Sequence, residues 1–196
     1  DRILVDPFCG SGTFPIEAAM MAANMAPGMN RSFLAEDWKN IIGRKYWYEA
    51  MDEANELVDD KVQVDIQGYD IDGDIVKAAR ANAQSAGVDH MIHFQQRPVS
   101  ALSHPKKYGF LISNPPYGER IEEKANLPGL YKEIGERFAA LDSWSMYLIT
   151  SYGDAEKQIG RKADKNRKIY NGMLKTYFYQ FMGPKPPKRS QESRES

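Results

Sequence analysis

The sequence predicts an α/β fold with a mostly parallel sheet that ends in an antiparallel hairpin. Short apolar runs alternate with segments of helical periodicity along most of the chain, which indicates βαβ units. Near the end the pattern changes to two alternating runs joined by Asn171-Gly172, the strongest short signal for a two-residue hairpin turn. With 196 residues, of which 42% are hydrophobic, the chain can form one domain with a substantial core.

Each predicted strand is a short apolar run followed by a turn signal or a helical pattern. We expect strands near residues 3–6, 64–70, 92–95, 110–113 and 145–150. We expect helices over 15–26, 46–60, 74–86 and 130–141, and the hairpin over 165–170 and 174–181. The domain then covers residues 1–182 with a long insertion at 27–62, and we expect residues 183–196, with their prolines and scattered charges, to form a disordered tail.

The most informative motif is Asn114-Pro115-Pro116-Tyr117, which follows the predicted strand at 110–113. The prolines stop the strand and fix the backbone, so that the Asn114 amide and the Tyr117 ring are held at the carboxyl end of the strand. Such a loop suits a planar group that carries an amino group. Asn114 Oδ1 and the Pro115 carbonyl can accept the two amino hydrogens, while Tyr117 stacks on the ring. Taken alone, the tetrapeptide can equally be a plain proline-rich turn.

A glycine-rich turn follows the first predicted strand, in the stretch Asp6-Pro7-Phe8-Cys9-Gly10-Ser11-Gly12-Thr13. Glycines allow a ligand to approach the backbone closely, and the helix that follows presents free N–H groups to an anion. The stretch lacks the third glycine of the dinucleotide-binding fingerprint and the Gly-Lys-Ser/Thr end of a P-loop. A Gly-x-Gly turn of this kind is by itself weak evidence for a cofactor.

An acidic residue, Asp70, ends the second predicted strand. In open α/β sheets an acid at this place binds ribose hydroxyls. A strand-end aspartate can equally cap a helix, although Asp72 is the better candidate for the cap of the helix at 74–86.

In this order, the glycine-rich turn, the acid after the second strand and the Asn-Pro-Pro-Tyr loop resemble the class I S-adenosylmethionine-dependent amino-methyltransferases. That class has a Rossmann-like, mostly parallel sheet with a C-terminal antiparallel hairpin. The segments 22–33, 36–38 and 167–172 are further similar to an RNA methylase family, which includes the bacterial enzymes that methylate guanine N2 of large-subunit ribosomal RNA. The resemblance spans residues 1–182.

The resemblance implies transfer of a methyl group from S-adenosylmethionine to an exocyclic amine of an RNA base, with guanine N2 of ribosomal RNA as the first candidate. It assigns catalysis to Asn114, Pro115 and Tyr117. It assigns cofactor contacts to Asp6, Pro7, Gly10, Gly12, Thr13, Asp70, Ile71 and Asn114. Asp6 would orient the cofactor amine and Asp70 would hold the ribose. Relatives usually contact the adenine through an Asp near residues 95–100, where this chain offers only Arg97 and Ser100.

Two other transferases share these features, and a third reading is a non-catalytic binding module that keeps the fold. An adenine-N6 DNA methyltransferase has the same loop and cofactor turn, but the Ala-Pro-Gly-x-x-Arg segment at 26–31 and the absence of a recognisable target-recognition region disfavour it. A protein glutamine methyltransferase also suits the loop, and the basic segment near the end of the chain counts against it. The intact loop and turn disfavour a non-catalytic module.

The formal net charge of the chain is −1, whereas a protein that binds nucleic acid without help from another domain usually has a basic surface. Between Lys157 and Lys175, however, seven basic residues stand against the single acid Asp164. They form either a solvated hairpin face or a rim that contacts phosphates. Family members carry an N-terminal RNA-binding (THUMP-type) region. We therefore expect the chain to be an excised catalytic domain, whose missing region supplies much of the RNA affinity.

Cysteine and histidine usage favours structural roles. Cys9 lies in the cofactor turn, so we expect it to pack there rather than act as a nucleophile, and a single cysteine excludes an internal disulfide. His90, His93 and His104 lack the spacing of a zinc site, so no metal is expected. The sequence shows no signal peptide and no apolar run as long as a membrane span, and we expect a cytoplasmic protein.

The insertion at 27–62 carries four aromatic residues, Trp38, Tyr46, Trp47 and Tyr48. They can be a platform for stacked bases. Aromatics at such spacing more often pack an added helix onto the sheet, and that is the prediction we adopt.

Overall fold

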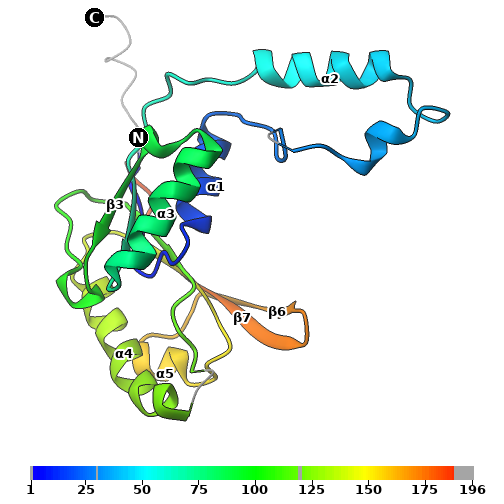
Figure 1. Ribbon diagram of the computed structural model, residues 1–196. Helices are drawn as coiled ribbons and strands as arrows, with labels where there is room; N and C mark the ends of the chain where they lie inside the picture. The colour runs from blue at the N-terminus through cyan, green and yellow to red at the C-terminus, as the bar shows by residue number, and fades with distance from the viewer. Residues whose placement is uncertain (1, 30, 119–120, 188–196) are drawn as a thin grey trace, which may run out of the picture.

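A seven-stranded sheet with the strand order β3-β2-β1-β4-β5-β7-β6 forms the centre of the computed structural model, which describes residues 2–29, 31–118 and 121–187 (Figure 1). The strands are β1 (Leu4–Asp6), β2 (Ile66–Asp70), β3 (Ile92–Gln96), β4 (Phe110–Ser113), β5 (Ser145–Thr150), β6 (Lys165–Asn171) and β7 (Leu174–Phe181). The first five run parallel, whereas β7 is antiparallel to both β5 and β6. The predicted α/β fold with a C-terminal antiparallel hairpin is confirmed.

The strand order contains a switch point between β1 and β4. The chain proceeds outward from β1 to β2 and β3, and then returns to place β4 on the other side of β1. At such a point the loops after the two central strands diverge, which leaves a crevice at the carboxyl ends of the strands. The glycine-rich turn after β1 and the Asn-Pro-Pro-Tyr loop after β4 are therefore neighbours across this crevice.

Helices cover both faces of the sheet. The helices of the chain are α1 (Thr13–Ala22), α2 (Arg44–Glu56), α3 (Gly73–Ala86), α4 (Ile121–Ala139) and α5 (Ala155–Ile159), with short 3-10 turns η1 (Leu34–Asp37), η2 (Asp89–Met91) and η3 (Val99–Ala101). All of these helices except α2 pack on the sheet. One core cluster joins α1 and α3 to the sheet, and a second joins α4 and α5 to it. Figure 1 shows α1 beside α3, and α4 beside α5. Side chains alternate between the two clusters along the strands, as the period of a strand requires.

The caps of α3 agree with the sequence. Asp72 Oδ1 accepts hydrogen bonds from the backbone N–H of Asp74 at 2.8 Å and of Ile75 at 3.5 Å, so Asp72 is the N-cap that we predicted. Gly87, with φ +76°, ends the helix in the left-handed conformation that glycine adopts without strain.

The largest error in the predicted elements concerns α4, which begins at Ile121 and not near residue 130. Pro128 lies inside this helix, where a proline is normally unfavourable. The helix continues because Leu127, Tyr131, Ile134 and Phe138 fall on one face at helical spacing and are all buried in the core. That burial offsets the backbone hydrogen bond that proline cannot donate. The short helix α5 was not predicted, and the other elements agree within a few residues.

Within the segment at 27–62, η1 and α2 do not pack onto the sheet, so our prediction for the aromatic residues is wrong. Figure 1 shows η1 and α2 projecting away from the body of the domain. Helix α2 contains no buried residue, and Trp38, Tyr46 and Tyr48 are exposed. The aromatic contact found here is local: the rings of Phe33 and Trp47 meet edge to face, with centroids 5.6 Å apart.

After β7 the described chain continues to residue 187 without helix or strand. The rest of the expected tail, residues 188–196, lies outside the described residues. Within the described residues, no helix has the length and apolar character needed to cross a membrane.

Candidate active site

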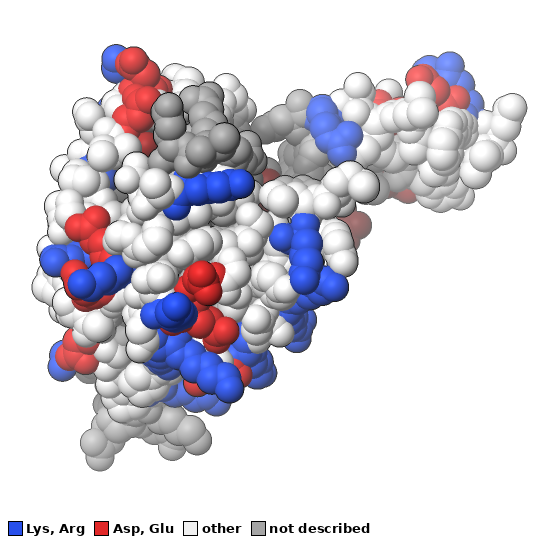
Figure 2. Space-filling view, turned by 90° about the horizontal axis from the view of Figure 1, so that it is seen from below, with Lys and Arg blue, Asp and Glu red and all other residues white. Residues whose placement is uncertain are grey.

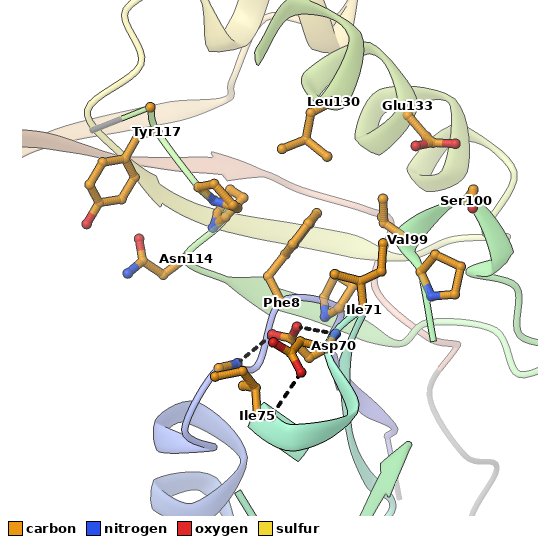
Figure 3. A pocket seen from close by; sticks show the side chains of 17 residues that line it. Phe8, Asp70, Ile71, Ile75, Val99, Ser100, Asn114, Tyr117, Leu130 and Glu133 are labelled. Carbon is orange, nitrogen blue, oxygen red and sulfur yellow. Dashed lines mark hydrogen bonds between the residues drawn. The ribbon is translucent and has the colours of Figure 1, made fainter. Parts of the chain in front are cut away.

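A cavity of about 1040 Å³ lies at the carboxyl ends of β1, β2 and β4 (Figure 3). It is lined by Pro7, Phe8, Gly10, Asp70, Ile71, Asp72, Ile75, Pro98, Val99, Ser100, Asn114, Pro115, Pro116, Tyr117, Gly118, Leu130 and Glu133. Seven of the site residues singled out in the sequence are in this set: Pro7, Gly10, Asp70, Ile71, Asn114, Pro115 and Tyr117. Asp6, Gly12 and Thr13 are not. The crevice at the switch point therefore brings together most of the predicted site.

The Asp70 carboxylate joins two neighbouring segments at the floor of this cavity. Its Oδ2 accepts a hydrogen bond from the Gly10 backbone N–H at 3.2 Å, and its Oδ1 accepts one from the Asp72 N–H at 3.0 Å. Figure 3 shows the carboxylate below Phe8 and close to Ile71. A carboxylate has about four lone-pair positions, so these two bonds leave acceptor capacity for hydroxyl groups of a ligand.

The two glycines of the turn have different roles. At Gly10 the backbone has φ +52° and a Cβ would meet no atom within 4 Å, so the missing side chain leaves open space on the cavity wall. At Gly12, with φ +89°, a Cβ would lie 3.1 Å from Ile16 Cδ1 and 3.1 Å from Phe94 Cζ. Gly12 is therefore needed for packing α1 on the core, and its expected direct approach to a cofactor is not seen. Thr13 is exposed at the start of α1.

Asp6 is buried, with 1% of its surface exposed. Its Oδ1 accepts hydrogen bonds from the Ser113 hydroxyl at 2.5 Å and from the Phe8 backbone N–H at 3.1 Å. Burial, opposed by these bonds, raises the pKa of the Asp6 carboxyl to about 7. The side chain thus links the end of β1 to the residue just before Asn114. This position differs from the cofactor contact that we expected from the resemblance.

The Asn-Pro-Pro-Tyr loop presents its two functional side chains on one wall. Asn114 is exposed and Tyr117 half-buried, and Figure 3 shows them side by side at the end of the pocket away from Ser100 and Glu133. The loop is fixed from behind by Tyr131 of α4, whose hydroxyl donates a hydrogen bond to the Pro116 carbonyl oxygen at 3.2 Å. The Asn114 amide is therefore held at the cavity by a loop that is itself anchored.

The opposite end of the cavity is apolar with a few polar groups. Ile71 has 72% of its surface exposed there, beside Pro98, Val99 and Ser100. Of the two candidates for an adenine contact, Ser100 lines the cavity. Arg97 does not, because its guanidinium donates to the Ala101 carbonyl and to Ser103 Oγ.

The lining residues that were not assigned to the site from the sequence include Phe8, Ile75, Leu130 and Glu133. Phe8 is part of the glycine-rich turn, so its place in the motif was an available signal. Ile75 lies three residues after Asp72, and an apolar residue in an otherwise polar first helical turn was a weaker signal. Nothing in the local sequence distinguishes Leu130 and Glu133, which reach the cavity through the packing of α4.

Cys9 has the structural place that we predicted. It is buried in the core cluster under α1 and α3. Burial, together with the nearby carboxylates of Asp6 and Asp70, raises the pKa of its thiol to about 12. The thiolate, which is the nucleophilic form, is therefore strongly disfavoured.

The fold, the glycine-rich turn and the loop after β4 together define a class I methyltransferase domain. The chain belongs to the family described as "RMKL-like, methyltransferase domain", whose match covers residues 1–180. It is 44% identical over 189 residues to "Putative RNA methyltransferase YpsC" of Bacillus subtilis (strain 168), covering 96% of this chain and 49% of that protein. It is 38% identical over 180 residues to "Ribosomal RNA large subunit methyltransferase K/L" of Shewanella baltica (strain OS185), covering 89% of this chain and 25% of that protein.

Solved structures of similar proteins support the same assignment. A possible methylase from Clostridium difficile 630 is 51% identical with a TM-score of 0.91, over 95% of this chain and 49% of that one. SMU.472, a putative methyltransferase complexed with SAH, is 45% identical with a TM-score of 0.90, over 95% and 49% of the two chains. A predicted N6-adenine-specific DNA methylase from Listeria monocytogenes is 41% identical with a TM-score of 0.86, over 94% and 47%. The chain thus spans about half the length, or less, of the relatives named here.

Proposed function

We propose that this domain transfers a methyl group from S-adenosylmethionine to an exocyclic amine of an RNA base, with guanine N2 of large-subunit ribosomal RNA as the preferred target. The observation that carries the proposal is that Asn114 and Tyr117 line the same cavity as Asp70 and Gly10. A loop suited to binding an amine and an acidic residue suited to binding ribose hydroxyls thus lie at one crevice. The name of the Bacillus relative points to RNA, and the name of the Shewanella relative to large-subunit ribosomal RNA.

The cavity fits S-adenosylmethionine on the evidence of its own residues. The open space at Gly10 suits the methionine part, the remaining acceptor capacity of Asp70 suits the ribose hydroxyls, and Ile71 with Val99 offers apolar surface for the adenine. Pro7 and Asn114 complete the wall. Asp6, Gly12 and Thr13 act indirectly in this proposal, by holding the turn and the start of α1. When bound, S-adenosylmethionine supplies a methyl group already activated by a positively charged sulfur.

The task left to the protein is to orient a poor nucleophile. The lone pair of an exocyclic amine on a base is delocalised into the ring. If Asn114 Oδ1 and the Pro115 carbonyl oxygen accept its two hydrogens, the nitrogen can become pyramidal with its lone pair directed into the cavity. Tyr117 stacks on the base, which must leave its helical stack to reach the loop. The amine releases a proton to water after methylation, so the loop needs no strong base.

The test of this proposal is Asn114→Ala in the full-length protein. Methyl transfer to ribosomal RNA should fall by roughly 10²–10³-fold, the usual effect of one preorganised polar contact to a reacting centre. Affinity for S-adenosylhomocysteine, measured by calorimetry, should be nearly unchanged. Asn126→Ala is the matched control, since Asn126 is exposed on α4 and does not line the cavity. Wild-type turnover in the Asn114→Ala enzyme would mean that the loop is only a structural turn.

A separate measurement distinguishes between the candidate substrates. The name of the Listeria relative favours adenine in DNA as the second candidate, and a protein glutamine is the third. Mass-spectrometric nucleoside analysis of ribosomal RNA from a strain lacking the gene should show the loss of one N2-methylguanosine. Intact RNA modification together with loss of N6-methyladenine from DNA would support the second candidate instead.

A further inference from the structure

A second cavity, of about 690 Å³, adjoins the first at the Asn-Pro-Pro-Tyr loop. The two cavities share Tyr117 and Gly118. The second is otherwise lined by α4, by the segment after β5 and by the start of β7, through Lys124, Leu127, Ser151, Tyr152, Gly153 and Leu174. None of the residues that we assign to the cofactor lines it. A ligand group in this second cavity can therefore approach Tyr117 without entering the cofactor part of the first.

The side chains of the second cavity have the chemistry of a nucleotide site. Tyr117 and Tyr152 are both half-buried and offer two aromatic surfaces, on which bases of any kind can stack. Lys124 is exposed at its edge and can approach a phosphate, while Ser151 adds one hydroxyl. Sequence-specific RNA recognition uses this combination, because unstacked bases lie on aromatic rings while cations contact the backbone.

The two tyrosines are fixed relative to each other by a buried chain of hydrogen bonds. The Tyr152 backbone N–H donates to Thr150 Oγ1 at 3.0 Å, Thr150 Oγ1 lies 2.6 Å from the Tyr131 hydroxyl, and Tyr131 donates to the Pro116 carbonyl. Tyr131 and Thr150 are fully buried. The rings of Tyr131 and Tyr152 also pack together, with centroids 4.8 Å apart. The segment that carries Tyr152 and the loop that carries Tyr117 are thus anchored to one residue, Tyr131.

We propose that this second cavity is the acceptor subsite and takes one unstacked RNA nucleotide. Its base contacts Tyr117 and Tyr152, its amino group reaches Asn114 at the boundary of the two cavities, and its phosphate lies near Lys124. The proposal rests on the proposed RNA-methylating function. It also accounts for the basic hairpin, because Leu174 lines the cavity and the exposed Lys175 follows it in β7, beside β6 with its own basic residues. The hairpin would then bind the neighbouring phosphates.

The test uses the full-length protein and large-subunit ribosomal RNA from a strain that lacks the gene. Tyr152→Ala should raise the KM for RNA by about 10–100-fold, the range expected from losing one stacking contact. Tyr152→Phe should stay within about twofold of the wild type. Both variants keep the backbone N–H that bonds Thr150, so the buried hydrogen-bond chain is retained. The affinity for S-adenosylhomocysteine should be unchanged in both.

A second variant tests the proposed contact between Lys124 and a phosphate, and a matched control accompanies it. Lys124→Gln should raise the KM for RNA and lower its dependence on salt, because one phosphate contact is lost. Lys132→Gln should change neither, since Lys132 is exposed on the same helix, pairs with Glu136 and lines neither cavity.

The outcomes separate the subsite from the proposed function. A wild-type enzyme that methylates RNA, combined with an unchanged KM in Tyr152→Ala, would overturn the subsite alone. Loss of S-adenosylhomocysteine binding in Tyr152→Ala would assign that residue to the cofactor side and also overturn it. A wild-type enzyme that methylates a glutamine peptide and not RNA would overturn the proposed function, and the nucleotide subsite with it.

Discussion

The Asp70 carboxylate holds two backbone N–H groups of the protein and, in our proposal, also binds the ribose of the cofactor. Its two oxygens accept from Gly10 and Asp72, while the side chain remains on the cavity wall. We expect Asp70→Ala to weaken the binding of S-adenosylhomocysteine by on the order of 10–100-fold, because a charge-assisted hydrogen bond is worth about 1.5–3 kcal/mol. Calorimetry measures this directly. Asp74→Ala, on the exposed side of α3, is the control and should bind normally. Equal affinities for the two variants would remove Asp70 from the cofactor site.

Asp6 should make the stability of the domain depend on pH. Burial raises the pKa of its carboxyl from an ordinary value of 3.8 to about 7. Between these values the folded state holds a proton that the unfolded state has lost, so stability falls as the pH rises through this window. The loss can reach about 4 kcal/mol, at about 1.4 kcal/mol per pKa unit.

The variant Asp6→Asn cannot titrate and isolates this effect. The free energy of unfolding of this variant, measured by urea denaturation, should increase relative to that of the wild type from pH 4 to pH 7 and then level off, because only the wild type loses stability in this range. Titration of all other groups cancels in the difference. A difference that stays constant across that range would show that the Asp6 carboxyl is ionised in the fold at all these pH values.

The functional and capping residues that could be predicted from the sequence are those whose role follows from the residues adjacent to them in the chain. Asn114 and Tyr117 are adjacent to two prolines, and Asp72 stands in front of a helical pattern, so each could be placed before the fold was known. Leu130 and Glu133 reach the cavity only because α4 packs across the end of the sheet. The packing role of Gly12 could not be predicted for the same reason, since Phe94 and Ile16 approach it only in the folded chain.

At the scale of elements, the same distinction explains the two errors. We expected this helix from residue 130, whereas α4 begins at Ile121 and includes Pro128, because burial of the Leu127–Phe138 face in the core stabilises the helix there. The aromatic spacing of α2 suggested a packed helix, but a partner surface cannot be read from spacing, and α2 projects from the body instead (Figure 1). The five parallel strands and the hairpin were predictable because each carries its own apolar run and turn signal.

The hairpin of β6 and β7 is the element whose positive charge should contribute most to RNA binding. Lys165, Arg167 and Lys168 are exposed, and none of them forms an ion pair with another described residue. If they contact phosphates, replacing Arg167 and Lys168 by Gln in the full-length protein should lower the slope of log affinity for single-stranded RNA against log salt by about 1.4. Binding of S-adenosylhomocysteine should be unaffected.

The matched control for the hairpin replaces Lys45 and Lys77 by Gln, which removes the same charge from α2 and α3. Both lysines are exposed and paired with acids on their own helices. The control should leave the salt slope as in the wild type. An equal change in both double variants would mean that the hairpin contributes only through overall charge, and its role as a phosphate rim would be refuted.

At the scale of the whole molecule, the topology builds one crevice while the charge remains balanced. The switch point between β1 and β4 brings the cofactor turn and the acceptor loop together, although 100 or so residues separate them in the sequence. Figure 2 shows acidic and basic side chains interspersed over the left and centre of the main body, with Lys and Arg prevailing on its right-hand side and both signs on the projecting arm. The site that we propose for RNA methylation thus lies on a surface with little general attraction for RNA.

We therefore expect this chain alone to bind unstructured RNA weakly, because the formal net charge is −1 and sequence-independent affinity comes mainly from phosphate contacts. In a gel-shift assay at physiological salt its Kd should be about 10⁻⁴ M or weaker, the weak end of non-specific binding. A variant that neutralises Glu49, Asp52, Glu53 and Glu56 on the exposed helix α2 raises the net charge to +3 and tests whether charge is the limit. If it is, this variant should bind RNA more tightly and with a steeper salt dependence. The full-length protein, assayed beside it, should bind more tightly than either. A complex of the unmodified chain with RNA in the nanomolar range at physiological salt would contradict the expectation, because its affinity would then come from this domain despite its charge.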